Sequence, residues 1–242
     1  MKTYALFSRL VFLALMLLAT TGCGNLSVRD PDQNQTETQS VELGAASAAR
    51  IKINLDAGEL KIDGGAEKLV EGSFDYNFTE LKPRIQYTLE GSTGSLLIDQ
   101  PAKQALFNYR NPQVKWNLRL SNRVPVVLDI STGAGITDLN LTGIDLTNLS
   151  LQFGAGQGVI DLSNTWSHDV TANLKGGIGD LTIILPREMG AKVTVSGGIE
   201  KIQAVGLTKN GNEYTNAAFS TATHKLILVA ETGIGSVSLS TR

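Results

Sequence analysis

The chain has 242 residues, of which 42% are hydrophobic and 18% are charged, with 21 Lys and Arg against 23 Asp and Glu. The formal net charge of −2 excludes the dense basic face that is needed to neutralise nucleic-acid phosphates, so we expect no nucleic-acid partner. The apolar content is sufficient for the core of one or two domains. The single cysteine excludes a disulfide framework within the chain.

The first 22 residues have the layout of a secretory signal peptide. The basic residues Lys2 and Arg9 precede or border an apolar run from Leu10 to Ala19, which is followed by small residues. This run is too short to cross a bilayer as a helix, which needs about 20 residues. We therefore expect residues 1–22 to be removed and the mature protein to be extracytoplasmic.

Cys23 follows the small residues directly, an arrangement that resembles a bacterial lipobox, in which the cysteine sulfur is acylated. The position three before the cysteine is usually Leu and is Thr20 here. Ordinary signal-peptidase cleavage beside an incidental cysteine is the alternative. We predict a lipid anchor on Cys23 and a disordered polar tether up to residue 40, which spans roughly 20–25 Å and holds the folded part away from the membrane.

Two β regions follow the predicted tether. Residues 41–101 alternate apolar and polar positions between Gly-rich breaks, which predicts an N-terminal β domain. The alternation is lost over 102–113, interpreted as a connection to a second domain at 114–242. Strand candidates in the first region are 48–55, 58–63, 69–76, 83–89 and 95–99.

The second region repeats one pattern: an alternating apolar run, a glycine break and another alternating run. Corresponding glycines recur about every 21 residues, as from Gly133 to Gly154 and from Gly177 to Gly198. This period predicts an all-β fold, a single-stranded β-helix or β-solenoid-like stack in which successive coils pair and glycines turn the corners. The copies cover 128–141, 149–162, 170–185, 193–205 and 226–239, with a weaker copy at 51–62.

The period breaks once, over residues 206–225, where the Asn210-Gly211 pair predicts a tight turn. The simple interpretation is a peripheral hairpin or loop. The functional alternative is a partner-contacting excursion that presents Tyr214 and Phe219. In the connection, Tyr109 and Arg110 are further candidates for partner contact. The alternative there is that aromatic rings cap the stack while the cations reach solvent.

The glycine clusters match known ligand loops only in part. A dinucleotide-binding loop leads from a strand into a helix, whereas each cluster here is followed by another strand pattern. The stretch GGIGDLTII (176–184) carries Asp180 one position too early for the calcium-binding nonapeptide, and calcium needs six to eight oxygen ligands. The sequence contains neither GxSxG nor HExxH. We therefore predict no catalytic residue, no metal site and no cofactor.

The repeat region resembles the bacterial toast-rack family of candidate adhesins. The residues that carry this resemblance are WNLRLSNRVPVVLDISTGAG (116–135), GITDLNLTGIDLTNLSLQFGAGQGVIDLS, GGIGDLTIILP and GIGSVSL. The preceding region is similar to the N-terminal domain often paired with that family, through VELGAASAARIKINLDAGELKIDGG and FDYNFTELKPRIQYTLEGSTGSLLIDQP. The resemblance implies a β-helix-like stack outside the cytoplasmic membrane, without catalytic residues.

These observations lead to one main hypothesis and two alternatives. The main hypothesis is a lipid-anchored, non-enzymatic binding or structural module of the cell envelope, whose partner is an envelope protein or a cell-wall polymer. The first alternative is an envelope-stress component that contacts a membrane protein. The second is a polysaccharide-acting enzyme built on a β-helix, which would need two carboxylates about 5–10 Å apart in a groove.

Overall fold

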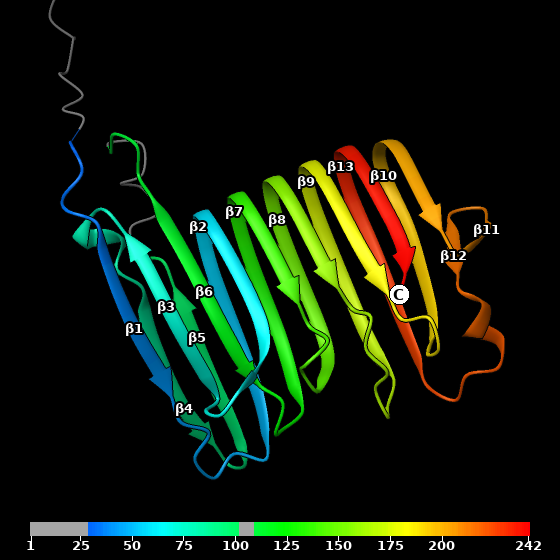
Figure 1. Cartoon of the computed structure of the whole chain (residues 1–242), viewed down its shortest axis with the longest axis horizontal. Helices are drawn as coiled ribbons and strands as arrows, with labels where there is room; N and C mark the ends of the chain where they lie inside the picture. Colours follow the sequence, from blue (N-terminus) through cyan, green and yellow to red (C-terminus); the bar gives the residue numbers. More distant parts are fainter. Residues whose placement is uncertain (1–28, 102–108) are drawn as a thin grey trace, which may run out of the picture.

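The computed structural model describes residues 29–101 and 109–242, most of which lie in β-strands (Figure 1). Within these ranges the remaining regular structure consists of short 3-10 turns, among them η1 (Thr79–Leu81) and η3 (Ala217–Ser220). No helix of the described ranges is long and apolar enough to span a membrane. The all-β prediction is confirmed. The predicted signal peptide and Cys23 lie outside the described residues.

Long strands that bend near their middle make up most of the sheet (Figure 1). Each bend separates a first arm from a second arm, and the two sets of arms form two layers that face each other. Neighbouring bent strands pair in parallel along both arms. These strands are β2 (Ala48–Ala66), β7 (Val126–Asn140), β8 (Leu146–Asp161), β9 (Val170–Leu185), β10 (Gly190–Val205) and β13 (Lys225–Thr241).

The bends form one row, which we call the crest. The register places Gly58 beside Gly135, Gly135 beside Gly156, and Gly156 beside Gly179. At Gly156 the backbone has φ +136°, and a Cβ atom would overlap the carbonyl oxygen of Gly135. Glycine is required here because it alone combines this backbone conformation with such close approach of the next backbone. The predicted role of the glycines as corners is confirmed at these positions.

Shorter strands complete both layers at their ends. In the layer of second arms, β6 pairs with β2 and β3, and β3 pairs with β1. In the layer of first arms, β5 pairs with β2 and β4, while β12 pairs with β10 and β11. Their bounds are β1 (Gln35–Val41), β3 (Val70–Tyr76), β4 (Arg84–Glu90), β5 (Thr93–Asp99), β6 (Val114–Ser121), β11 (Thr208–Asn210) and β12 (Glu213–Thr215).

The core lies between the two layers. Leu128 and Ile130 on the first arm of β7, and Leu139 on its second arm, are almost completely buried, as the two-residue alternation predicts. The prediction fails for the second arm of β10, where Ile202 is only partly buried and Ala204 is exposed. This arm forms the edge of its layer, so one side of it has no further strand to cover it.

Three sequence expectations need correction. The predicted disordered tether is wrong over residues 35–40, because these residues belong to β1 and pair with β3. The strand order is β9-β13-β10. The last strand of the chain, β13, therefore lies between β9 and β10 and does not follow β10. The weak copy at 51–62 is a complete bent strand, β2. It carries the strands of both predicted β regions in one continuous sheet, since β5 and β6 both pair with it.

The segment 206–225 is long enough for the chain to return from the end of β10 to the start of β13, which lies on the other side of β10. It contains the predicted hairpin, β11 and β12, whose turn includes Gly211 at φ +62°. The buried Asn216 fastens the segment to the sheet. Its side-chain oxygen accepts from the Ala191 N–H at 2.9 Å, and its nitrogen donates to the Met189 carbonyl at 2.7 Å. A buried amide with several partners fixes the position of a loop more strongly than an exposed one.

Candidate functional site

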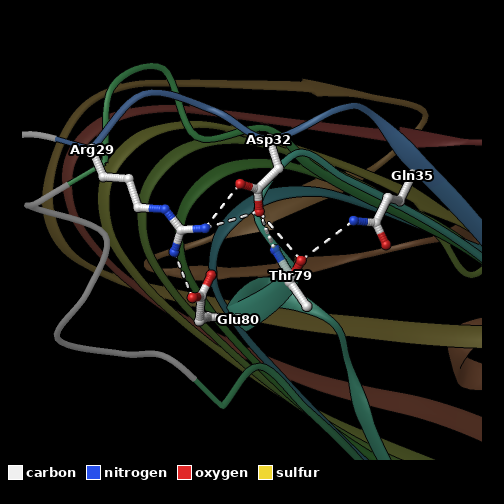
Figure 2. Close-up of polar contacts among 5 residues, drawn as sticks. All are labelled: Arg29, Asp32, Gln35, Thr79 and Glu80. Carbon is white, nitrogen blue, oxygen red and sulfur yellow. Dashed lines mark hydrogen bonds and ion pairs between the residues drawn. The ribbon is translucent and has the colours of Figure 1, made fainter.

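The described chain begins in a cluster of polar side chains next to η1 (Figure 2). The Arg29 guanidinium donates to Asp32 Oδ1 at 2.9 Å and to Glu80 Oε1 at 2.5 Å. The Thr79 N–H donates to Asp32 Oδ2 at 3.1 Å, and Gln35 Nε2 donates to Thr79 Oγ1 at 3.4 Å. We call these five residues the entry cluster. Asp32 links the chain before β1 to the start of η1.

Hydrogen bonding shifts the ionisation of the entry cluster. The Thr79 N–H and the Arg29 guanidinium lower the pKa of Asp32, and the bond from Arg29 lowers the pKa of Glu80. The bonds from Glu80 and Asp32 raise the pKa of Arg29. The side chains of all three residues are between 30% and 46% exposed, so solvent screens these pairs. The cluster is suited to fixing the position of the chain.

Tyr109 and Arg110 lie beside the entry cluster. The Tyr109 ring stacks on Phe78, with centroids 4.1 Å apart and an angle of 12° between planes, and the Arg29 guanidinium lies 5.7 Å from the Phe78 centroid. The Arg110 N–H donates to the Arg29 carbonyl at 2.9 Å, and its guanidinium lies 3.4 Å from Asp30. The Tyr109 ring is therefore engaged within the fold, while the Arg110 side chain, 62% exposed, can reach a partner.

The outer face of the second-arm layer carries an open hollow of 570 Å³ whose lining residues are mainly polar or charged. The register aligns Thr38 of β1, Ser73 of β3, Asn117 of β6 and Lys61 of β2 across it. A second hollow of 550 Å³ lies on the same strands toward the crest and includes Lys115. We call the two hollows together the polar trough. It is a broad, open surface over four strands.

Ion pairs border the polar trough, and within each pair the positive and negative charges cancel. Glu71 lies 3.2 Å from Arg119, and Lys61 lies 3.5 Å from Asp63. Hydroxyl and amide groups between these pairs both donate and accept hydrogen bonds, which suits a polar ligand of low net charge. No pattern in the sequence groups these residues. They are ordinary outward positions on β1, β2, β3 and β6, and only the pairing register brings them together.

Tyr214 and Phe219 lie at the opposite end of the sheet from Tyr109 and Arg110, so the structure does not unite the four predicted contact residues. Tyr214 is only 2% exposed, and the prediction that it contacts a partner is wrong because its ring packs into the core. Phe219 is partly exposed, with Lys225 Nζ 5.1 Å from its centroid. Of this pair, only Phe219 remains accessible.

In the two described ranges no three His, Cys, Asp or Glu side chains are grouped so that they could hold a metal ion. Asp180, which the calcium comparison singled out, accepts hydrogen bonds from the Ser236 hydroxyl at 2.5 Å and the Ser236 N–H at 3.3 Å. His168 lies 2.8 Å from Asp145, and this hydrogen bond raises the pKa of the imidazole. Both acids thus act within the fold.

Comparison with known proteins identifies relatives of the whole described body. Residues 30–184, more than half of the chain, match the N-terminal domain of toast_rack (DUF2154), and this match runs through the predicted connection at 102–113. A crystal structure of a candidate cell adhesion protein from Clostridium sporogenes is 29% identical, with a TM-score of 0.83. The similarity covers 87% of this chain and 100% of that one. A candidate adhesin from Bacteroides fragilis is 12% identical over 87% of this chain and 99% of that one, with a TM-score of 0.28. No curated protein matches the chain.

Proposed function

Because the chain belongs to the family of the toast_rack N-terminal domain (DUF2154), we propose that it is a non-enzymatic, adhesin-like binding module of the cell envelope. The observation that carries this proposal is the similarity, over the full length of that protein, to the candidate cell adhesion protein from Clostridium sporogenes. At 29% identity the two share more than a general layout of strands. We further propose that the bent strands form a short β-solenoid whose rigid faces display the binding groups.

The polar trough is the surface that best fits a cell-wall polymer as ligand. Its aligned side chains lie on neighbouring strands, which are about 4.8 Å apart. An extended polymer laid across them would meet a hydrogen-bonding group at each strand. The ion pairs at its border leave little net charge, which favours a neutral or zwitterionic polymer over a polyanion. An envelope protein that uses the same polar surface is the other partner class.

Binding can be tested by sedimenting the purified mature protein with isolated cell walls. We expect co-sedimentation, and we expect the double substitution Ser73→Lys and Asn117→Lys to weaken it at least about ten-fold, the loss of roughly one strong hydrogen-bonded contact. Ser150→Lys, on the outer face of the other layer, is the matched control. Equal binding by both variants would exclude the trough. Cell walls that bind no wild-type protein would point to a protein partner.

Anchoring through Cys23 is a separate part of the proposal. It is supported by the arrangement of residues 1–22, which place Cys23 directly after an apolar run and small residues. We expect Cys23→Ser to move the protein from the membrane fraction to the soluble extracytoplasmic fraction, because acyl chains supply stable membrane binding. Thr20→Leu, which restores the usual lipobox residue, should stay membrane-bound. A Cys23→Ser variant that still sediments with membranes would refute the lipid anchor.

A further inference from the structure

Large apolar side chains are exposed at the crest. Ile178 of β9 and Ile234 of β13 are 59% and 56% exposed and are direct cross-strand partners. Ile136, next to Gly135, is 48% exposed. Ala134 and Ala155 precede the bends of β7 and β8 and continue the same row. Leu89, Val159 and Val205 are further exposed hydrophobic side chains among the described residues, and Ile178 and Ile234 form a directly paired apolar contact at the crest.

The bends themselves do not require these isoleucines. The glycines turn the corners, and the inner side of each corner is filled by the backbone of its neighbour. Ile178 and Ile234 occupy outward positions beside those glycines, where a polar side chain would fit the fold equally well. Contiguous exposed apolar residues at such positions are typical of a surface that contacts another phase or protein.

The chain enters the fold at the same end of the molecule. Gln35, the first residue of β1, pairs with Tyr76, which pairs with Val114, and a Cβ at Gly58 would meet Val114. This register continues the row of the crest to β1. Figure 1 shows the start of β1 and the bends at one end of the molecule, and the loops that connect successive bent strands at the other end. The entry cluster, which includes Gln35 at the start of β1, therefore lies at the crest end.

The length of chain before the entry cluster limits how far this end can lie from an anchor. Arg29 lies six positions after Cys23, and a fully extended chain spans at most about 3.3–3.6 Å per residue. At full extension the anchor is thus within about 20 Å of Arg29, whereas a fully extended tether up to residue 40 would reach about 60 Å. Arg29 and Arg110 lie at this end, but both pair with the carboxylates of Asp32, Glu80 and Asp30, so they add no net positive charge toward lipid phosphates.

We propose that the crest lies against the lipid surface of the membrane, with Ile178 and Ile234 at the level of the headgroups. This inference rests on the proposed anchoring through Cys23. Beside the bends, Asp180 bonds to Ser236 and Lys175 lies 3.7 Å from Glu231, while the exposed Glu200 and Lys201 of β10 carry opposite charges. Two isoleucines bind a bilayer only weakly by themselves, but the anchor makes their contact intramolecular. The end of the sheet that carries the connecting loops would then face away from the membrane. The outer face that carries the polar trough would face along the membrane.

The test uses single-cysteine labelling of the lipidated full chain in native membranes. Because Cys23 is the only cysteine and its sulfur would be acylated, Ile178→Cys introduces the one reactive thiol. Glu188→Cys, exposed in the loop after the same strand, is the matched control. We expect a polar, membrane-impermeant maleimide to react at position 178 about five-fold more slowly in membranes than after detergent extraction, and at position 188 at similar rates in both.

The outcomes separate the two proposals. Equal rates at position 178 before and after extraction, in protein that sediments with membranes, would overturn the crest contact and leave the anchor intact. Protein that does not sediment with membranes would overturn both. Protection at position 178 that persists in detergent, in a protein that migrates as a dimer, would assign the crest to a second copy of the chain and would also overturn the lipid contact.

Discussion

The bent strands and the N-terminal end of the sheet turn the same corner in different ways. In β7, β8 and β9 one strand runs through each bend, and a glycine lies directly against the backbone of the preceding bent strand. Next to β2, the two arms are supplied by separate strands, β5 and β6. There the buried side chain of Gln100 accepts from the Asp56 N–H at 2.8 Å and the Ala57 N–H at 3.3 Å. Glycine is required only where backbone stacks on backbone.

The two regions also differ in how their cores are filled. The bent strands use mainly Leu, Ile and Val, because most of them pair with similar bent strands on both sides. The N-terminal end has no further bent strand beyond β2, and larger rings fill the space. Phe74 packs edge-on against Trp116 at 5.7 Å, and both are fully buried. Aromatic side chains close the end of a core efficiently because each covers a large area.

The largest expected effect breaks the regular bends. Gly156→Ala should destabilise the fold by about 4 kcal/mol or more, because the added Cβ would overlap the Gly135 carbonyl oxygen at a strained backbone conformation. The control Gly211→Ala has the same chemistry at φ +62° with open space around it, and should cost about 1 kcal/mol. Denaturant unfolding measures both. Similar losses in the two variants would mean that the crest is not tightly stacked.

An intermediate effect is expected at the bend of β2, where the buried side chain of Gln100 contacts the backbone beside Gly58. Gln100→Ala removes the side-chain oxygen that accepts from Asp56 and Ala57 in a buried place, and should cost about 2 kcal/mol. Gln86→Ala, at an exposed position of β4, should change the free energy of unfolding by less than about 0.5 kcal/mol. Unfolding midpoints that are the same for the two variants would show that Gln100 does not support the bend of β2.

The smallest effect concerns the entry cluster and its response to pH. Asp32 and Glu80 have lowered pKa values in the fold, so their contribution to stability is present above their unfolded pKa values, near pH 4, and is lost as pH falls through the folded values. The double variant Asp32→Asn and Glu80→Gln should therefore lose less stability than the wild type between pH 5 and about pH 3. Unfolding curves across this range measure it, and parallel curves would contradict the assignment.

Much of the bent-strand sheet is predictable from the sequence. The alternating runs predicted the buried positions on both arms, the glycine period located the corners, and Asn210-Gly211 marked the hairpin in 206–225. The weak copy at 51–62 was recognised as related, although its full role as β2 was not. These features are local, because alternation and turn chemistry are written in neighbouring residues.

The candidate sites were less predictable. Tyr109 and Arg110 stand out in the sequence as aromatic and basic residues, and they do lie near the entry cluster. The cluster itself is not predictable from the sequence, because only the fold brings Thr79 and Glu80 to Asp32 and Arg29. Tyr214 appeared to be a loop residue but is buried by the return of the chain through 206–225. The polar trough could not be seen at all, since its side chains belong to four strands joined only by register.

The sequence by itself determined the all-β character, the period and the place of each bend, because the spacing of apolar residues and glycines sets which face is buried and where the chain can turn. The tertiary structure decided the rest. It placed β13 between β9 and β10, paired residues 35–40 with β3 as part of β1, and positioned the entry cluster at the same end of the molecule as the crest. Pairing between strands distant in the chain depends on which edge is free when they meet, and no local pattern records that.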